Sequence, residues 1–103
     1  MMSQTGLGIK DLLQEQRGQI LEIAQKHGAY NVRVFGSVAR GEATEESDID
    51  FLVDYDLGKI TPWFPGGLLI DLERLLARQV DIATVDMLPE PMRDRVLHEA
   101  VML

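Results

Sequence analysis

The stretch VRVFGSVARGEATEESDIDFLVDYD, residues 32–56, places two apolar runs on either side of a polar turn. The first run alternates β-branched or aromatic residues with polar ones and predicts a strand over residues 30–35, ending at Gly36. The second run predicts the strongest strand of the chain, over residues 48–55. Successive side chains of a strand point to opposite faces. One face of this second strand is therefore apolar, with Ile49, Phe51, Val53 and Tyr55, and the other carries Asp48, Asp50, Leu52 and Asp54.

The rest of the chain predicts helices around this pair of strands. Apolar residues at helical spacing predict a helix from Ile9 that Gly28 closes, a second over residues 68–78 and a third over residues 89–103. The remaining stretches are a loose start (1–8), a turn or short helix (37–41), a surface loop (42–47), a longer loop (56–67) and a third strand (80–85). The element order predicts one α/β (α+β) domain over residues 9–103, with a short mixed sheet flanked by helices.

Composition excludes several classes of protein. The chain has 103 residues, 46% of them hydrophobic, which suits one globular domain. It contains no cysteine, which excludes disulfides and thiolate metal sites and fits a reducing cytoplasm. No apolar run is long enough to cross a membrane. The net charge of −7 is unlike the basic surface that grips a nucleic-acid backbone, so no direct nucleic-acid binding is expected.

Asp48 and Asp50 form a candidate metal site. Carboxylates two residues apart on a strand lie on the same side, where they repel each other unless a cation sits between them. Magnesium binds through one or two carboxylates and completes its shell with water and substrate phosphates. Taken alone, the pair is better explained as the solvated acidic start of a strand, because polar strand edges are common.

Gly36 and Ser37 form a candidate phosphate-binding turn before this strand. Glycine allows the backbone to approach a phosphate closely, and backbone N–H groups with a serine hydroxyl are donors for its oxygens. Arg40 lies one turn further on and adds a positive charge. A third carboxylate, Asp81, opens the predicted strand 80–85. If that strand lies beside residues 48–55, the three acids can hold two metal ions, an arrangement that supports phosphoryl-type transfer.

Gly36-Ser37, ten intervening residues, Asp48-Ile49-Asp50 and the later Asp81 together resemble the signature of polymerase-β-type nucleotidyltransferases. The wording of residues 32–56 is similar to that of the minimal nucleotidyltransferases (MNT) of bacteria and archaea. The resemblance runs from Val32 through the last predicted helix. One departure is Val38, where the family often has a basic or polar residue, which leaves Arg40 as the nearby cation.

The resemblance implies a polymerase-β-type nucleotidyltransferase fold that binds ATP with magnesium, as two ions. It implies that Ser37 holds the triphosphate, that Asp48 and Asp50 ligate both metals, and that Asp81 ligates the catalytic one and helps to activate the acceptor hydroxyl. It also implies an antitoxin that transfers AMP from ATP to a tyrosine of a HEPN-type ribonuclease toxin, with which a hetero-oligomer can form.

Two other functions remain open at this stage. The chain could neutralise its toxin by binding alone, with a vestigial catalytic site, or it could modify a small molecule. Trp63 and Phe64 could pack on the base, on a partner or under their own loop. The stripe of Met92, Val96, Ala100 and Leu103 in the last predicted helix is expected in the core or on a partner.

Overall fold

The computed structural model describes residues 6–103, in which four strands form a mixed sheet in the order β3-β2-β1-β4. The strands are β1 (Ala29–Phe35), β2 (Ile49–Tyr55), β3 (Val80–Ala83) and β4 (Val101–Met102). β1 pairs antiparallel with both β2 and β4, whereas β2 and β3 are parallel. The predicted short mixed sheet flanked by helices is therefore confirmed.

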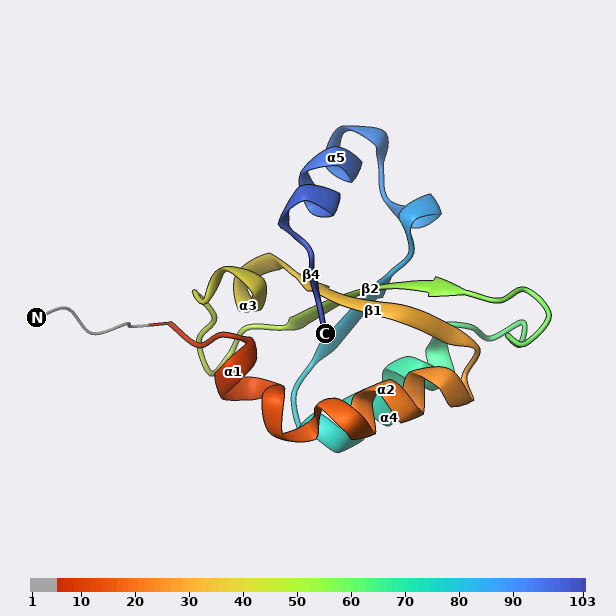
Figure 1. The fold of residues 1–103 in the computed structure, drawn as a ribbon, viewed down its shortest axis with the longest axis horizontal. Coiled ribbons are helices and arrows are strands. Elements are labelled where there is room, and N and C mark those ends of the chain that lie inside the picture. Colours follow the sequence, from red (N-terminus) through yellow and green to blue (C-terminus); the bar gives the residue numbers. More distant parts are fainter. Residues whose placement is uncertain (1–5) are drawn as a thin grey trace, which may run out of the picture.

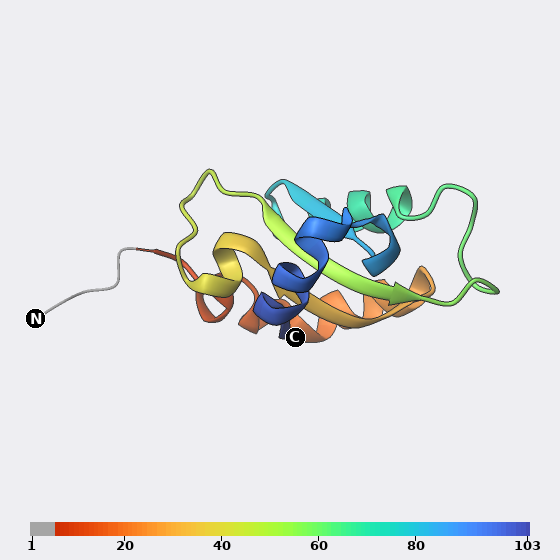
Figure 2. The ribbon, with the colours of Figure 1, turned by 90° about the horizontal axis from the view of Figure 1, so that it is seen from above.

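Two layers of helices cover the sheet unequally (Figures 1 and 2). One face packs on α2 (Arg17–Lys26) and α4 (Gly66–Leu76), and the opposite face lies under α5 (Glu90–Glu99). The helical segments α1 (Ile9–Leu12), η1 (Gln14–Gln16), α3 (Gly36–Arg40) and η2 (Val85–Met87) connect these layers. The larger core lies on the α2/α4 side, where the apolar face of β2 is buried, and includes Ile20, Ile49, Phe51, Val53 and Leu72.

Leu52 shows why the second face of the sheet also needs a cover. This residue shares its face with the aspartates, yet it is fully buried in a small cluster with Leu88 and Val96 of the C-terminal region. A short amphipathic helix suffices to cover it, because only this part of the face is apolar. The start of β2, with Asp50, is therefore left at the edge of the covered area.

The single N-terminal helix predicted from Ile9 is wrong, because the chain breaks at Leu13 into α1, η1 and α2. Leu13 is completely buried, and its side chain occupies the core at the point where the chain changes direction. Of the stretch 1–8 predicted as loose, residues 1–5 lie outside the described part. Leu7 exchanges two backbone hydrogen bonds with Ala43, at 2.8 and 3.0 Å, so the ordered domain begins before Ile9.

The predicted helix over residues 89–103 ends at Glu99, and residues 101–102 form β4 instead. Ala100 adopts an extended conformation, and the chain then pairs with the free edge of β1. Leu103 N–H donates to the carbonyl of Val32 at 2.9 Å. Satisfying the backbone groups of an exposed sheet edge outweighs one more helical turn here. The predicted helical stripe therefore does not exist as one face, and only Val96 of its members is buried.

Smaller boundaries also differ from the predictions. β2 begins at Ile49 and not at Asp48, and β3 ends at Ala83, because Val85 enters η2. α4 begins two residues earlier than predicted and ends at Leu76, since Ala77 turns into the left-handed region at φ 53°. Gly28, at φ 80°, closes α2 as predicted. No helix in residues 6–103 is long and apolar enough to span a membrane.

Candidate active site

Asp50 and Asp81 lie opposite each other on neighbouring strands. The parallel ladder between β2 and β3 pairs Ile49 with Val80 and Asp50 with Asp81. Residues paired across two strands point to the same face, so the two carboxylates share one side of the sheet. The two strands thus meet the condition on which the predicted cluster depended, and the sheet brings together two of the three predicted acids. Asp48, the third, is exposed in the loop immediately before β2.

The surroundings of Asp50 disfavour its charge. The pKa of Asp50 is raised to about 6, and burial is the largest cause. The neighbouring negative charges add to this rise, in decreasing order Asp81, Asp48 and Glu99, and Arg40 offsets only a part of it. Carboxylates that lie together with too little positive charge around them attract a cation.

Gly36 is required because the backbone runs directly against Asp50. Its φ of 75° lies in the left-handed region, which favours glycine. A β-carbon at this position would collide with Oδ2 of Asp50. The predicted phosphate turn and the predicted metal-binding strand therefore touch each other. Ser37, the second residue of α3, follows at the same place and is half-buried.

Arg78 holds the loop that carries Asp48 into place. Its guanidinium donates to the carbonyls of Thr44 and Ser47, at 2.7 and 2.9 Å. Ser47 Oγ in turn accepts a hydrogen bond from the Thr44 N–H at 2.9 Å. The acidic loop thus has a defined path into β2, and Arg78 is a supporting residue that the sequence analysis missed.

Glu99, at the end of α5, is a second residue that the sequence analysis missed. Its Oε2 accepts a hydrogen bond from Gly36 N–H at 2.6 Å, and its Oε1 accepts one from Arg40 at 2.7 Å. Burial by itself raises the pKa of Glu99, but these two hydrogen bonds and the charge of Arg40 outweigh it and leave the pKa below its usual range. An isolated glutamate near a chain end carries no motif, so no sequence signal singles it out.

Arg40 is not the only cation at this place. Arg95 of α5 lines the same hollow of about 370 Å³, together with Gly36, Arg40 and Glu99. Its charge also lowers the pKa of Glu99. The sequence predicts Arg40 alone because Arg95 lies 55 positions further along the chain and reaches the site only through the packing of α5.

The donor set at the start of β2 fits magnesium. Within residues 6–103, no three acidic or histidine side chains lie close enough together to hold a metal ion among them. Magnesium needs only one or two carboxylates, because phosphates and water complete its shell. Asp50 and Asp81 supply such a pair, and the raised pKa of Asp50 reflects a negative environment that a divalent cation would neutralise.

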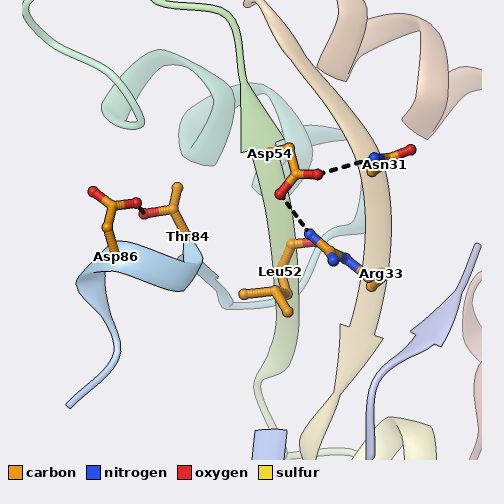
Figure 3. Close-up of polar contacts among 6 residues, drawn as sticks. All are labelled: Asn31, Arg33, Leu52, Asp54, Thr84 and Asp86. Carbon is orange, nitrogen blue, oxygen red and sulfur yellow. Dashed lines mark hydrogen bonds and ion pairs between the residues drawn. The ribbon is translucent and has the colours of Figure 1, made fainter. Parts of the chain in front are cut away.

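The other end of β2 is built differently (Figure 3). Asp54 lies on the same face as Asp50 but accepts hydrogen bonds from Arg33 and from Asn31, each at 2.9 Å. In the loop beyond this end, Phe64 packs against Tyr55 with ring centroids 5.4 Å apart, and Trp63 is 78% exposed. Asp50 and Tyr55 are five residues apart along the strand, or about 17 Å. Phe64 therefore packs within its own loop against Tyr55, and this loop lies far from Asp50 and Asp81.

The site geometry agrees with comparisons to known proteins. The family model described as "Nucleotidyltransferase domain" matches residues 17–102. This chain belongs to the nucleotidyltransferase family. The matched segment of this nucleotidyltransferase includes the Gly36 turn, the aspartates of β2 and β3, and Glu99.

Proteins similar to this nucleotidyltransferase carry more specific names. A protein of Methanocaldococcus jannaschii named "Putative protein adenylyltransferase" is 38% identical over 89 residues, which are 86% of this chain and 95% of that protein. "Protein adenylyltransferase MntA" of Thermococcus cleftensis is 36% identical over 81 residues, which are 78% and 80% of the two chains. The solved "Structure of putative minimal nucleotidyltransferase" superposes with a TM-score of 0.81 at 41% identity, over 96% of this chain and 99% of that one. The predicted family and the predicted enzyme class are confirmed.

Proposed function

We propose that this nucleotidyltransferase transfers AMP from ATP, with magnesium, to a tyrosine hydroxyl of a HEPN-type ribonuclease toxin, and so acts as its antitoxin. The observation that carries the proposal is the pairing of Asp50 with Asp81 directly beside the Gly36 turn. A site for negative phosphates and a site for cations adjoin there. The names of the relatives support a protein as the acceptor.

In this proposal the Gly36 turn binds the triphosphate and the aspartates bind the metal. Gly36 N–H, the Ser37 hydroxyl and Arg40 bind the triphosphate, and Asp48, Asp50 and Asp81 hold magnesium. Bound magnesium would supply charge neutralisation for the phosphates and the leaving group. Asp81, on the short outer strand β3, is exposed and lies at the sheet edge, where an acceptor protein can approach.

The transfer is a substitution at the α-phosphorus. A bond forms between the acceptor oxygen and the α-phosphorus, and the bond between the α-phosphorus and the bridging oxygen to the β-phosphate breaks. The products are the adenylylated acceptor and pyrophosphate. Asp81 accepts the proton of the attacking hydroxyl, and the donors of the Gly36 turn keep the triphosphate in line for attack.

The test combines the protein with labelled ATP, magnesium and a HEPN-type protein encoded beside it. Label is expected on the HEPN protein, and the variant Asp48→Asn/Asp50→Asn is expected to lose the transfer by roughly a thousandfold or more, about 4 kcal/mol of barrier. Asp54→Asn is the matched control, since Asp54 lies on the same strand and face but is paired with Arg33. Its rate should stay within about threefold of the wild type, as expected for a change away from the reacting groups.

Three other results would contradict the proposal. A HEPN protein that is bound and inhibited without label indicates neutralisation by contact alone. Label on a small molecule in place of the protein indicates a different acceptor class. Equal loss in the Asp54→Asn control would show that the aspartates of β2 act through the fold and not through the reaction.

A further inference from the structure

A carboxylate already occupies the anion-binding position of the proposed site. Glu99 accepts the hydrogen bonds of Gly36 N–H and of Arg40, at 2.6 and 2.7 Å. These are the donors that the proposed function assigns to the triphosphate. Two anions cannot both take the same charge-assisted hydrogen bonds, so ATP and this position of Glu99 exclude each other.

The elements on both sides of Glu99 fix its position. Glu99 is the last residue of α5, and the chain beyond it is fastened to the sheet edge, where Val101 pairs with Val34. Leu103 N–H then donates to Val32 at 2.9 Å. The Glu99 side chain is only 21% exposed. It is therefore held over the Gly36 turn by both the helix before it and the strand after it.

Glu99 also adds a negative charge beside the paired carboxylates of Asp50 and Asp81. Its charge contributes to the raised pKa of Asp50, so its present position is electrostatically unfavourable toward the proposed metal ligands. A carboxylate that served only to fasten α5 could be replaced by a neutral hydrogen-bond acceptor without this cost. Its charge mimics that of a phosphate.

A place to which Glu99 can move adjoins the site. The hollow of about 370 Å³ between α3 and α5 is lined by Gly36 and Arg40 on one side and by Met92 and Arg95 of α5 on the other, and the α5 side is the part that a displaced Glu99 can enter. Arg95 is exposed on α5 and already attracts Glu99, since its charge lowers the pKa of that carboxyl. A side chain displaced from Gly36 can thus turn into this hollow and keep a cationic neighbour.

We propose that Glu99 is an internal competitor for the polyphosphate of the nucleotide: it holds Gly36 and Arg40 while the site is empty and must be displaced when ATP binds. This inference rests on the proposed function and adds to it a residue that sets nucleotide affinity. Ligands with a polyphosphate have to displace Glu99, whereas a nucleoside without phosphates does not. Its return to the same donors also favours the release of pyrophosphate.

The experiment compares nucleotide binding by calorimetry, in magnesium and without an acceptor protein, for wild type, Glu99→Gln and Glu42→Gln. Glu99→Gln keeps the size of the side chain and an acceptor oxygen but removes the charge. It should bind ATP and pyrophosphate about tenfold more tightly than wild type, because a neutral amide competes less well for charged and backbone donors. Adenosine should bind both proteins equally.

Glu42→Gln is the matched control, since Glu42 also pairs with Arg40, at 3.0 Å, but is 66% exposed. Its ATP affinity should change by no more than about twofold, as for other exposed ion pairs. Thermal unfolding of each variant shows whether the fold is kept.

The outcomes separate the two proposals. Unchanged or weaker binding of ATP and pyrophosphate by a folded Glu99→Gln variant overturns the competitor role and leaves the proposed function standing. An equal gain for adenosine also overturns it, since the effect would then not depend on phosphate. The absence of ATP binding in wild type and in both variants overturns the proposed function itself, and the role of Glu99 with it.

Discussion

Asp50 and Asp54 lie four residues apart on β2 and point to the same face, but their surroundings differ. Figure 3 shows the Asp54 end. Asp54 forms an ion pair with Arg33, whose side chain is 17% exposed, and accepts a further hydrogen bond from Asn31. Asp50 faces Asp81 across the ladder and has the backbone of Gly36 pressed against it. The fold therefore places a cation, Arg33, directly against Asp54. At Asp50 the nearby positive charge of Arg40 offsets only a part of the negative charge.

This difference separates a carboxylate that stabilises the fold from one to which the proposed function assigns metal binding. A paired, partly buried carboxylate adds to stability, whereas carboxylates gathered without cations reduce it. Such unfavourable groupings persist at sites where a ligand compensates them. The two ends of one strand face thus serve different purposes, and three substitutions can test that division.

The largest effect is expected from Gly36→Ala, at the Asp50 end. The new β-carbon collides with Asp50 Oδ2, and φ of 75° is unfavourable for alanine, so the free energy of unfolding should fall by about 3 kcal/mol. Denaturant unfolding measures this change. The matched control is Gly18→Ala in α2, where a β-carbon meets nothing within 4 Å and a gain of about 0.5–1 kcal/mol is expected.

Adding Asp50→Ala to Gly36→Ala sharpens this test. Since the collision involves the Asp50 carboxylate, the double variant should recover a part of the lost stability. Purely additive losses would show that Gly36 is needed for its backbone conformation alone and that its contact with Asp50 is unimportant.

An intermediate effect is expected from Asp54→Ala, at the other end. Arg33 loses its ion pair while its side chain stays largely covered, so the free energy of unfolding should fall by about 1–2 kcal/mol. Chemical denaturation at neutral pH measures it. Asp94→Ala, an exposed position on α5, should change stability by less than about 0.5 kcal/mol. An Asp54→Ala protein as stable as wild type would remove the contrast between the two ends.

The smallest effect is expected from the charge of Asp50 itself, measured without metal in the presence of a chelator. Its folded pKa of about 6 lies above the ordinary value of 3.8, so the folded state favours the protonated form. The associated stability is fully present below pH 4 and is lost as the pH rises through 6. The variant Asp50→Asn has no ionisable group at this position, so it does not lose this stability as the pH rises.

Asp50→Asn should therefore gain stability relative to wild type between pH 4 and pH 7.5, by about 1 kcal/mol, because solvent around this half-buried group screens the shift. Urea unfolding at the two pH values measures this change. A difference between the two proteins that is the same at both pH values would mean that Asp50 is not destabilised by its neighbours. Magnesium should stabilise wild type at pH 7.5 and leave the variant nearly unaffected.

Much of the site follows from local patterns in the sequence. The alternation along residues 48–55 places Asp50 and Asp54 on one face, as predicted. The sequence also singles out Asp81, although only the pairing of β2 with β3 brings it to Asp50. The need for glycine at position 36 is also a local property, since its backbone lies in the left-handed region. Strand alternation and backbone conformation are set by neighbouring residues, so a local pattern can reveal them.

The C-terminal segment could not be predicted in the same way. Helical spacing continues through Leu103, yet the segment 101–102 becomes a strand because β1 offers an unpaired edge. Leu52 appears on the polar face of β2 in the sequence, and only the position of α5 explains its complete burial. Pairing partners and helix positions depend on contacts distant in sequence, which a local pattern does not contain.

The sequence by itself supplied the residues of the candidate site: a glycine turn, a serine and aspartates at a spacing that resembles the nucleotidyltransferase signature. The tertiary structure alone decided what surrounds these residues. Glu99 reaches Gly36 across 63 positions of sequence, and Arg95 enters the same hollow from the same helix. The physical reason is that backbone conformation and strand alternation act between neighbouring residues. The charge environment of a carboxylate is instead set by whichever groups the folded chain packs around it.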